Sequence, residues 1–337
     1  MAGCARAWAG SSFLVRGMIV WRRLRALIAD GPTRRAFWRY WVIDVAMGVA
    51  SYAMHFGLRR VPFGACSAIG AGLGVLIGRC RGFHRPDLPA RATFARLRPQ
   101  ASKKRDLDLA MKRMCANIGR AYAEYNILDL LGAAGRITVT GQEYLAACRD
   151  RHRPIIVCGV HLTSWEVIGA ALIALGYEIH TLYRPAKNRF QDRIVVAVRT
   201  GQRVRKGGAK LIPPGPRGLR QAYRVLTERG LFLTWVDEAI NGSPRVPAFG
   251  RPIYQRGNLA AVVRLARATG AELIPAYVER RVGGRFHTTF GAPIELIRAE
   301  DEKAALLANL RRLDELLSSI ILPRLEDWWM LRGLRLD

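Results

Sequence analysis

One histidine and one glutamate are the residues of this chain whose types and spacing best suit acid–base chemistry. The run 154–160 is typical of a buried strand, His161 follows it directly, and an apolar helix then continues to Gly176. Residues five apart on an ideal helix differ by about 140° of rotation, so His161 and Glu166 can meet only if His161 lies in the turn before the helix. We therefore expect His161 to fold back onto Glu166, which would fix the imidazole tautomer and support the imidazolium formed during proton transfer.

The same residues allow two other interpretations. Thr163 and Glu166 match the S/T-x-x-E capping box, in which the glutamate only secures the first turn of the helix. Taken alone, the spacing favours this capping role over catalysis. Zinc is the other alternative, but the sequence has no His-x3-His pair, no C-x-x-C pair and no cysteine at a metal-ligand spacing from a histidine. We therefore expect neither a metal site nor a bound cofactor.

The elements that must position His161 alternate regularly from residue 104 onward. Helical stretches are predicted at 104–131, 142–150, 164–175, 187–206, 216–229, 257–269 and 301–320. Short apolar runs are found between them at 137–140, 154–160, 178–183, 231–236, 272–279 and 285–290. Strands interleaved with helices predict an α/β domain over 104–337, with a central, mostly parallel sheet flanked by helices. Ligands on such sheets bind beyond the carboxyl ends of the strands, where His161 is expected.

The chain before this domain is basic and then hydrophobic. Residues 1–40 hold eight Arg and one Asp, without the long apolar run and cleavage site of a signal peptide. Residues 41–82 contain two apolar stretches, 41–58 and 63–78, which are at or below the length needed to cross ~30 Å of hydrocarbon. The arginines that flank these stretches are Arg59, Arg60, Arg79 and Arg81. Monotopic attachment to the cytoplasmic leaflet satisfies all these charges, so we expect an N-terminal hydrophobic helical membrane anchor. Two buried helices of a soluble domain are the alternative.

Residues 83–103 and the overall charge give further expectations. Because 83–103 carries three prolines among many arginines, it is predicted to be a linker. The formal net charge of +28 reflects either a compositional bias spread over a solvated surface or attraction to anionic partners such as lipid phosphates. Nucleic acid is not expected as a partner, because the basic residues are scattered and no zinc-finger, RNP-like or helix-turn-helix pattern accompanies them.

Four sequence blocks occur in a fixed order along the chain. They are His161-Leu-Thr-Ser-Trp-Glu166; Tyr183-Arg184-Pro185 followed by Asn188; Val236-Asp237-Glu238 with Val246-Pro247-Ala-Phe-Gly250; and Leu265-Ala-Arg-Ala-Thr-Gly-Ala271 with Ile274-Pro275. With these blocks the chain, from about residue 118 to the C-terminus, resembles the bacterial late lipid A acyltransferases. These are the lauroyl and myristoyl transferases of the lysophospholipid acyltransferase superfamily, which implies a glycerolipid acyltransferase-like fold. Each block alone is modest evidence, whereas four in register are specific.

The resemblance implies roles for four residues. It makes His161 and Glu166 the catalytic residues, and it assigns Arg184 and Asp237 to the substrate site or to its support. Because Arg184 follows a predicted strand, its guanidinium could reach the same sheet edge as His161 and bind a phosphate or an oxyanion. An ion pair with Asp237 is the alternative. A further basic set could hold lipid phosphates or an acidic carrier protein, or could be a solvated helix face: Arg199, Arg203, Arg205, Lys206 and Lys210.

The resemblance also implies an activity and a location. We expect acyl transfer from a thioester, on acyl carrier protein or CoA, to a hydroxyl of a membrane lipid such as a lipid A precursor, at the cytoplasmic face of the bacterial inner membrane. Three departures from the family pattern concern Ser164, where many members have Asn, Glu238, which replaces a usual Gln, and the end 325–330. They leave another glycolipid or glycerolipid open as the acceptor. A non-catalytic, basic membrane-binding protein is the remaining alternative.

Overall fold

The computed structural model describes residues 31–82, 85, 88–201, 209–240 and 243–336. Their contacts separate two compact units. The smaller unit comprises the described part of Met1–His55 together with Pro185–Val195, and the larger unit comprises the described parts of Phe56–Arg184 and Val196–Asp337. Most of the expected basic segment 1–40 therefore lies outside the described residues.

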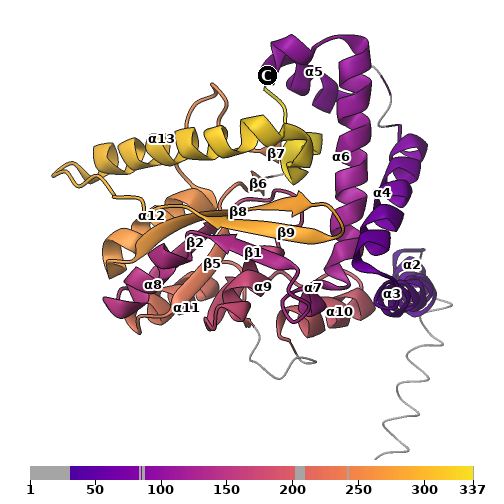
Figure 1. Ribbon diagram of the computed structural model, residues 1–337, viewed down its shortest axis with the longest axis horizontal. Helices are drawn as coiled ribbons and strands as arrows, with labels where there is room; N and C mark the ends of the chain where they lie inside the picture. The colour runs from indigo at the N-terminus through magenta and orange to yellow at the C-terminus, as the bar shows by residue number, and fades with distance from the viewer. Residues whose placement is uncertain (1–30, 83–84, 86–87, 202–208, 241–242, 337) are drawn as a thin grey trace, which may run out of the picture. The chain divides into compact units, whose positions relative to one another are not determined.

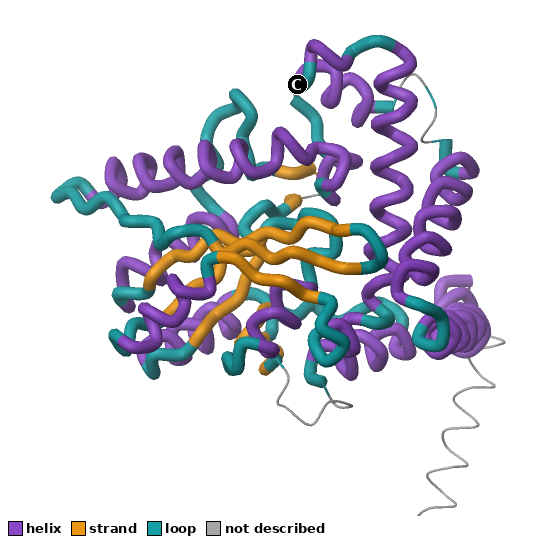
Figure 2. Tube along the Cα trace, in the orientation of Figure 1, coloured by secondary structure: helices purple, strands orange, loops and turns teal. Residues whose placement is uncertain are grey.

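The larger unit is built on a seven-stranded sheet in the order β1-β9-β8-β2-β5-β3-β4 (Figure 1, with the strands in orange in Figure 2). The strands are β1 Ile137–Thr140, β2 Ile155–Gly159, β3 Ile179–Leu182, β4 Lys210–Ile212, β5 Leu231–Trp235, β8 Glu272–Arg281 and β9 Arg285–Phe290. β8, β2, β5, β3 and β4 pair in parallel, β9 pairs with β8 antiparallel, and β1 runs parallel to β9. The predicted α/β fold with a mostly parallel sheet is confirmed.

Helices cover both faces of this sheet. They are α8 Gln142–Asp150, α9 Val167–Ala174, α11 Pro216–Thr227, α12 Gly257–Thr269 and α13 Glu302–Ile321. A further helix, α10 Arg189–Arg199, begins in the segment Pro185–Val195 of the smaller unit. The connection from β2 to β3 through α9 runs toward the β4 edge of the sheet. The connections from β4 to β5 through α11 and from β5 to β8 through α12 run in the opposite direction. Right-handed crossovers of opposite direction place their helices on opposite faces. Every residue of β2 and β5 is accordingly buried, as expected for central parallel strands.

The sequence analysis missed three short strands. β4 has three residues, and a separate hairpin pairs β6, Ala239–Ile240, with β7, Ser243–Pro244. Segments this short carry too few residues for an alternating pattern to stand out. The predicted helix 187–206 is also shorter than expected, because α10 ends at Arg199.

Part of the predicted linker 83–103 is folded. Helix α5, Pro89–Leu97, buries Ala90, Thr93 and Phe94 and contacts α6, Lys104–Tyr125, and the C-terminal 3-10 helix η4, Trp329–Gly333. Pro89 occupies the first turn of α5, where its missing N–H removes no intrahelical hydrogen bond. The prolines therefore mark the start of a packed helix, and the linker prediction is wrong for this part of the segment.

The second hydrophobic stretch forms α4, Phe63–Cys80, which packs along α6 (Figure 1). Gly70 and Gly74 of α4 face Gly119 of α6, and a Cβ added at any of the three would clash with backbone of the other helix. The glycines thus allow the two backbones to approach closely, as small residues do between membrane helices. The outward face of α4 exposes large apolar side chains: Ile69, Leu73, Leu76 and Ile77.

The first hydrophobic stretch belongs to the smaller unit. A continuous helical run consists of α2 Gly31–Trp38, the π-helix η1 Arg39–Ile43 and α3 Asp44–Leu58. The Asn188 amide donates to the carbonyl of Asp44 at 2.8 Å, and Arg189 donates to the carbonyl of Tyr40 at 2.8 Å. These bonds tie the start of α10 to the helical run within this unit.

Two described helices, Gly31–Leu58 and Phe63–Cys80, are long and apolar enough to cross a membrane. Only 17% and 28%, respectively, of their most apolar windows are buried within the protein. The alternative of two buried helices of a soluble domain requires these apolar faces to lie inside the molecule. In the described residues most of each window is exposed, which favours the membrane-associated interpretation of the two helices.

One buried carboxylate gives a test of how this fold responds to pH. Asp314 of α13 accepts a hydrogen bond from the backbone N–H of Ala248 at 2.7 Å and so holds the loop 246–250. Burial raises the pKa of Asp314 above its ordinary value of 3.8, against the opposing effects of that hydrogen bond and Arg251. The protonated form is therefore favoured by folding, and its stabilisation is complete below pH 3.8 and is lost as pH rises through the raised pKa.

We predict that Asp314→Asn, which keeps an acceptor for Ala248, flattens this part of the pH profile of the unfolding free energy and raises stability at neutral pH. Denaturant titrations at several pH values measure this. The matched control is Glu143→Gln, which removes an exposed carboxylate of α8 and should leave this part of the profile unchanged. An unaltered slope in Asp314→Asn contradicts the prediction.

Candidate active site

Two neighbouring strands bring His161 and Asp237 together. β2 and β5 pair in register with Gly159 opposite Trp235, so the second residue after each lies at the same point of the sheet's carboxyl edge. Nδ1 of His161 lies 2.8 Å from Oδ1 of Asp237, and the backbone N–H of His161 donates to Oδ2 of Asp237 at 2.9 Å. Asp237 is therefore the carboxylate that holds the imidazole.

Asp237 is fully buried, and a third donor completes its surroundings. Nε1 of Trp328 donates to Oδ2 of Asp237 at 2.7 Å, and the aspartate has 0% exposure. The His161 side chain keeps 18% exposure. Because Nδ1 is bonded to the carboxylate, Nε2 is the ring nitrogen left for proton transfer with a substrate.

Glu166 has a different partner. Nε of Arg199 donates to Oε2 of Glu166 at 3.1 Å, and Nη2 of Arg199 contacts Oε1. Burial alone would lower the pKa of Arg199, but Glu166 and Tyr125 raise it above its ordinary range, so the guanidinium stays charged. No hydrogen bond joins Glu166 to His161 among the described residues, and Asp237 takes the place that we expected Glu166 to fill.

The capping interpretation of Glu166 is also wrong. Helix α9 begins at Val167, and Glu166 itself occupies the N-cap position without a side-chain cap. The physical reason for both corrections is the turn between His161 and the helix. Thr163 adopts a left-handed backbone with φ of 54°, so the chain does not enter the helix where the spacing suggested.

Arg184 follows β3, as predicted, and its side chain is exposed. Among the described residues it forms no hydrogen bond or ion pair, and Asp237 is occupied by other donors, so the suggested Arg184–Asp237 pair is wrong. Of the further basic set, Arg199 binds Glu166 and Lys210 binds Glu178 at 2.7 Å. The other members of that set lie outside the described residues: Arg203, Arg205 and Lys206.

The C-terminal segment runs antiparallel along the turn that carries His161. Leu162 bridges Trp328, the N–H of Thr163 donates to the carbonyl of Asp327 at 3.0 Å, and the N–H of Trp329 donates to the carbonyl of His161 at 2.9 Å. Sequence reasoning missed these contacts, and the bond from Trp328 to Asp237, because the residues that they join are far apart in the chain; Trp328 and Asp237 alone are 91 positions apart. The Glu-Asp-Trp-Trp run was the only signal for them.

Indole rings surround the imidazole. The ring centroids of Trp165 and Trp235 lie 5.2 Å and 5.7 Å from that of His161, and Trp329 packs edge-on against Trp165 at 4.9 Å. Tryptophan walls of this kind provide apolar surface beside a polar reacting group. The described residues contain no cluster of His, Cys, Asp and Glu that could hold a metal ion.

An apolar groove of about 400 Å³ begins next to these rings. One wall is a single stripe at helical spacing, formed by α9 and its N-cap residue: Glu166, Gly169, Ala170, Ile173 and Ala174. β3, β5 and the short helix α7, Leu128–Leu131, supply other walls. The stripe extends over about 12 Å, at 1.5 Å per residue. Trp235 lines the groove and also neighbours His161, so one wall of the groove packs beside the imidazole.

The geometry thus combines a histidine–carboxylate pair at the sheet edge with a long apolar groove, which suits chemistry on the end of a hydrocarbon chain. A comparison with curated proteins finds no match to this chain. The family model described as bacterial lipid A biosynthesis acyltransferase matches residues 33–335, which include every site residue discussed above. The chain therefore belongs to the bacterial lipid A biosynthesis acyltransferase family and is an acyltransferase.

Proposed function

We propose that this enzyme transfers a fatty acyl group from a thioester on acyl carrier protein to a hydroxyl of a lipid A precursor. The observation that carries the proposal is the groove, because its apolar walls suit an acyl chain and one of its lining residues, Trp235, packs beside His161. A hydrocarbon chain in the groove would bring its carbonyl carbon to the imidazole.

In the proposed mechanism His161 is the general base. Nε2 takes the proton of the acceptor hydroxyl as its oxygen attacks the thioester carbonyl, while Asp237 holds Nδ1 and supports the imidazolium. Collapse of the tetrahedral intermediate breaks the C–S bond, and the imidazolium returns the proton to the leaving thiolate. The ester product and the free thiol then balance the reactants.

We assign Glu166 and Arg199 to the polar end of the groove. Both line it, and their ion pair is largely buried, with side-chain exposures of 13% and 16%. Removal of one member of such a pair leaves the other charge without its partner. Glu166 would then act on the position of the acyl donor through Arg199, rather than as the hydrogen-bond partner of His161.

We place the enzyme at the cytoplasmic face of the bacterial inner membrane, with α4 lying in the interface. The exposed ridge of α4 is apolar, yet α6, which packs along α4, exposes Lys112 and Arg113. A crossing α4 would draw these two charges toward the hydrocarbon, which is costly. An in-plane α4 inserts its ridge and leaves both charges in water.

The first prediction separates the two carboxylates. His161→Ala should lower kcat by about 10²–10⁴. Asp237→Asn should also lower kcat, with little change in KM, because the imidazole loses its orienting partner. Glu166→Gln should mainly raise KM for the acyl donor.

Mass spectrometry of acyl transfer from acyl carrier protein to a purified lipid A precursor measures these effects, with acyl-CoA and a glycerolipid acceptor as parallel substrates. If Asp237→Asn keeps kcat while Glu166→Gln loses it, then Glu166 and not Asp237 is the carboxylate that supports His161 in catalysis. Transfer only to the glycerolipid would reject the lipid A precursor as acceptor.

The second prediction concerns chain length. Ala170→Leu fills the groove about 6 Å along α9 from Glu166, and Ala174→Leu fills it at about 12 Å. In competition among acyl donors, both variants should shift transfer to shorter chains, Ala170→Leu the more strongly. Ala147→Leu in α8, which does not line the groove, is the control and should keep the wild-type preference. An unchanged preference in both groove variants would rule out this groove as the acyl site.

The third prediction tests the position of α4. A fluorophore is attached at Leu73→Cys, with the exposed Cys80 and the N-terminal Cys4 changed to Ser. It should be quenched most strongly by lipids that are brominated near their headgroups. Leu219→Cys in α11 is matched in exposure, at 45% against 46% for Leu73, and should not be quenched. Maximal quenching by bromine near the bilayer centre would instead indicate a crossing helix.

A further inference from the structure

We infer that the buried Glu124–Arg280 pair is a positioning device that holds the His161 turn in a strained conformation through Ser164 and Asp327. The inference rests on the proposed function, because it assigns the turn's geometry a part in acyl transfer. Both residues lie outside the four sequence blocks that carried the resemblance.

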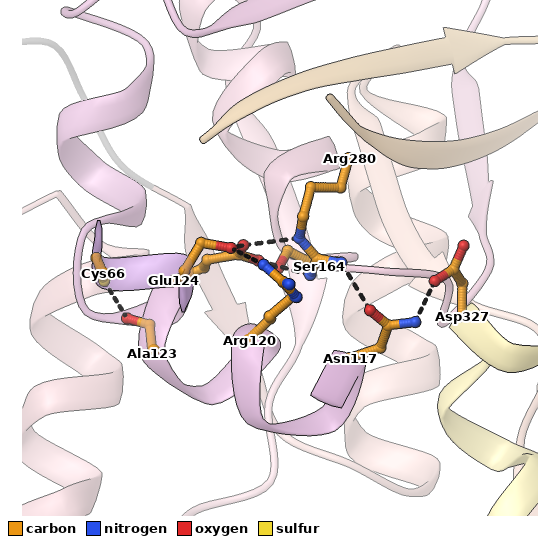
Figure 3. A network of polar contacts seen from close by, with 9 residues as sticks. Cys66, Asn117, Arg120, Ala123, Glu124, Ser164, Arg280 and Asp327 are labelled. Atoms are coloured by element: carbon orange, nitrogen blue, oxygen red, sulfur yellow. Dashed lines mark hydrogen bonds and ion pairs between the residues drawn. The ribbon is translucent and has the colours of Figure 1, made fainter. Parts of the chain in front are cut away.

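The centre of the device is the carboxylate of Glu124 on α6 (Figure 3). Glu124 is buried, with 1% exposure. Arg280 of β8 binds it with two donors, Nε to Oε1 at 2.7 Å and Nη2 to Oε2 at 2.8 Å. The Ser164 hydroxyl donates to Oε2, and the Ser67 hydroxyl of α4 donates to Oε1 at 2.7 Å. A bidentate, charge-assisted pair of this kind fixes geometry strongly, so it provides a rigid anchor for Ser164.

A second arm leaves Arg280 and returns to the same turn. Nη1 of Arg280 donates to Oδ1 of Asn117 at 3.2 Å, and Nδ2 of Asn117 contacts Oδ1 of Asp327 (Figure 3). The carbonyl of Asp327 then accepts the N–H of Thr163 at 3.0 Å. The contacts thus form a closed ring that leaves the turn at Ser164 and re-enters it one residue earlier, at Thr163.

Thr163, the residue that this ring of contacts encloses, explains why the turn needs the ring. Thr163 is β-branched and has φ of 54°, a left-handed conformation that such residues adopt at a cost in free energy. Strained backbone of this kind persists only where the surroundings over-determine it. The closed ring of contacts supplies that constraint. The constrained turn carries His161, whose imidazole must face both Asp237 and the groove.

The main test is a substitution and its rescue. Ser164→Ala should lower kcat by about tenfold to a hundredfold, because small misplacements of a catalytic group are costly, while KM for the acyl donor stays near wild type. Adding Thr163→Gly should restore most of the lost kcat, because glycine holds positive φ without strain. Arg229→Gly is the matched control: Arg229 also has positive φ, 62°, but lies in the exposed turn before β5. It should leave kcat unchanged and should not rescue Ser164→Ala.

The second arm of the test uses Glu124. Glu124→Gln and Ser164→Ala should be strongly non-additive in kcat, because both break the same contact. Unchanged kcat in Ser164→Ala, additive losses in the double variant, or equal rescue by Thr163→Gly and Arg229→Gly would each overturn the inference. Circular dichroism and thermal melts identify any variant that fails to fold, and Ser164→Asn then replaces it as a hydrogen-bonding probe expected to retain kcat.

A readout without activity separates this inference from the proposed function. Hydrogen exchange of the peptide 160–166 should speed up in Ser164→Ala and stay unchanged in Arg229→Gly, even if no acyl transfer is found with any donor. Absence of transfer by the wild type, with this exchange pattern present, would reject the proposed function and keep the ring as a clamp on the turn. Unchanged exchange in Ser164→Ala would reject the ring itself.

Discussion

The buried carboxylate of Asp237 is the group around which the site is assembled. A charge with no exposure to water must be compensated by donors, and here the imidazole and N–H of His161 and the indole of Trp328 supply them. These donors come from distant parts of the chain, so the requirement brings together β2, β5 and the C-terminal segment. Phe249 packs edge-on against Trp328 at 5.7 Å, which adds the loop held by Asp314 to the same assembly.

The turn that carries His161 separates two environments of opposite character. The first is the groove, which Glu166 lines and whose small and apolar residues leave room for a substrate. The second is the ring of polar contacts around Glu124, which Ser164 joins and in which donors are matched to acceptors. A fully bonded polar network is rigid, whereas an apolar groove accepts chains of varied conformation. Within this turn the fixed polar contacts are made at Thr163 and Ser164, whereas Glu166 lines the groove.

The departures from the family pattern fall on supporting contacts. Ser164 bonds to Glu124 rather than to a substrate-facing group, and Glu238 accepts the N–H of Asn258 at the start of α12. The C-terminal run that only loosely echoed the family's closing block supplies Trp328. None of these changes replaces His161 or Asp237, the pair on which the proposed chemistry depends.

The sequence by itself determined the alternation of strands and helices, the placement of His161 at a strand end and the family, because each depends on local periodicity or on short motifs. It did not determine the partner of His161. The spacing of four intervening residues suggested Glu166, but sheet pairing places Asp237 beside the histidine, and a left-handed Thr163 separates the histidine from the helix that follows. Strand order and backbone handedness arise from contacts between residues far apart in the chain. Only the tertiary structure could decide them.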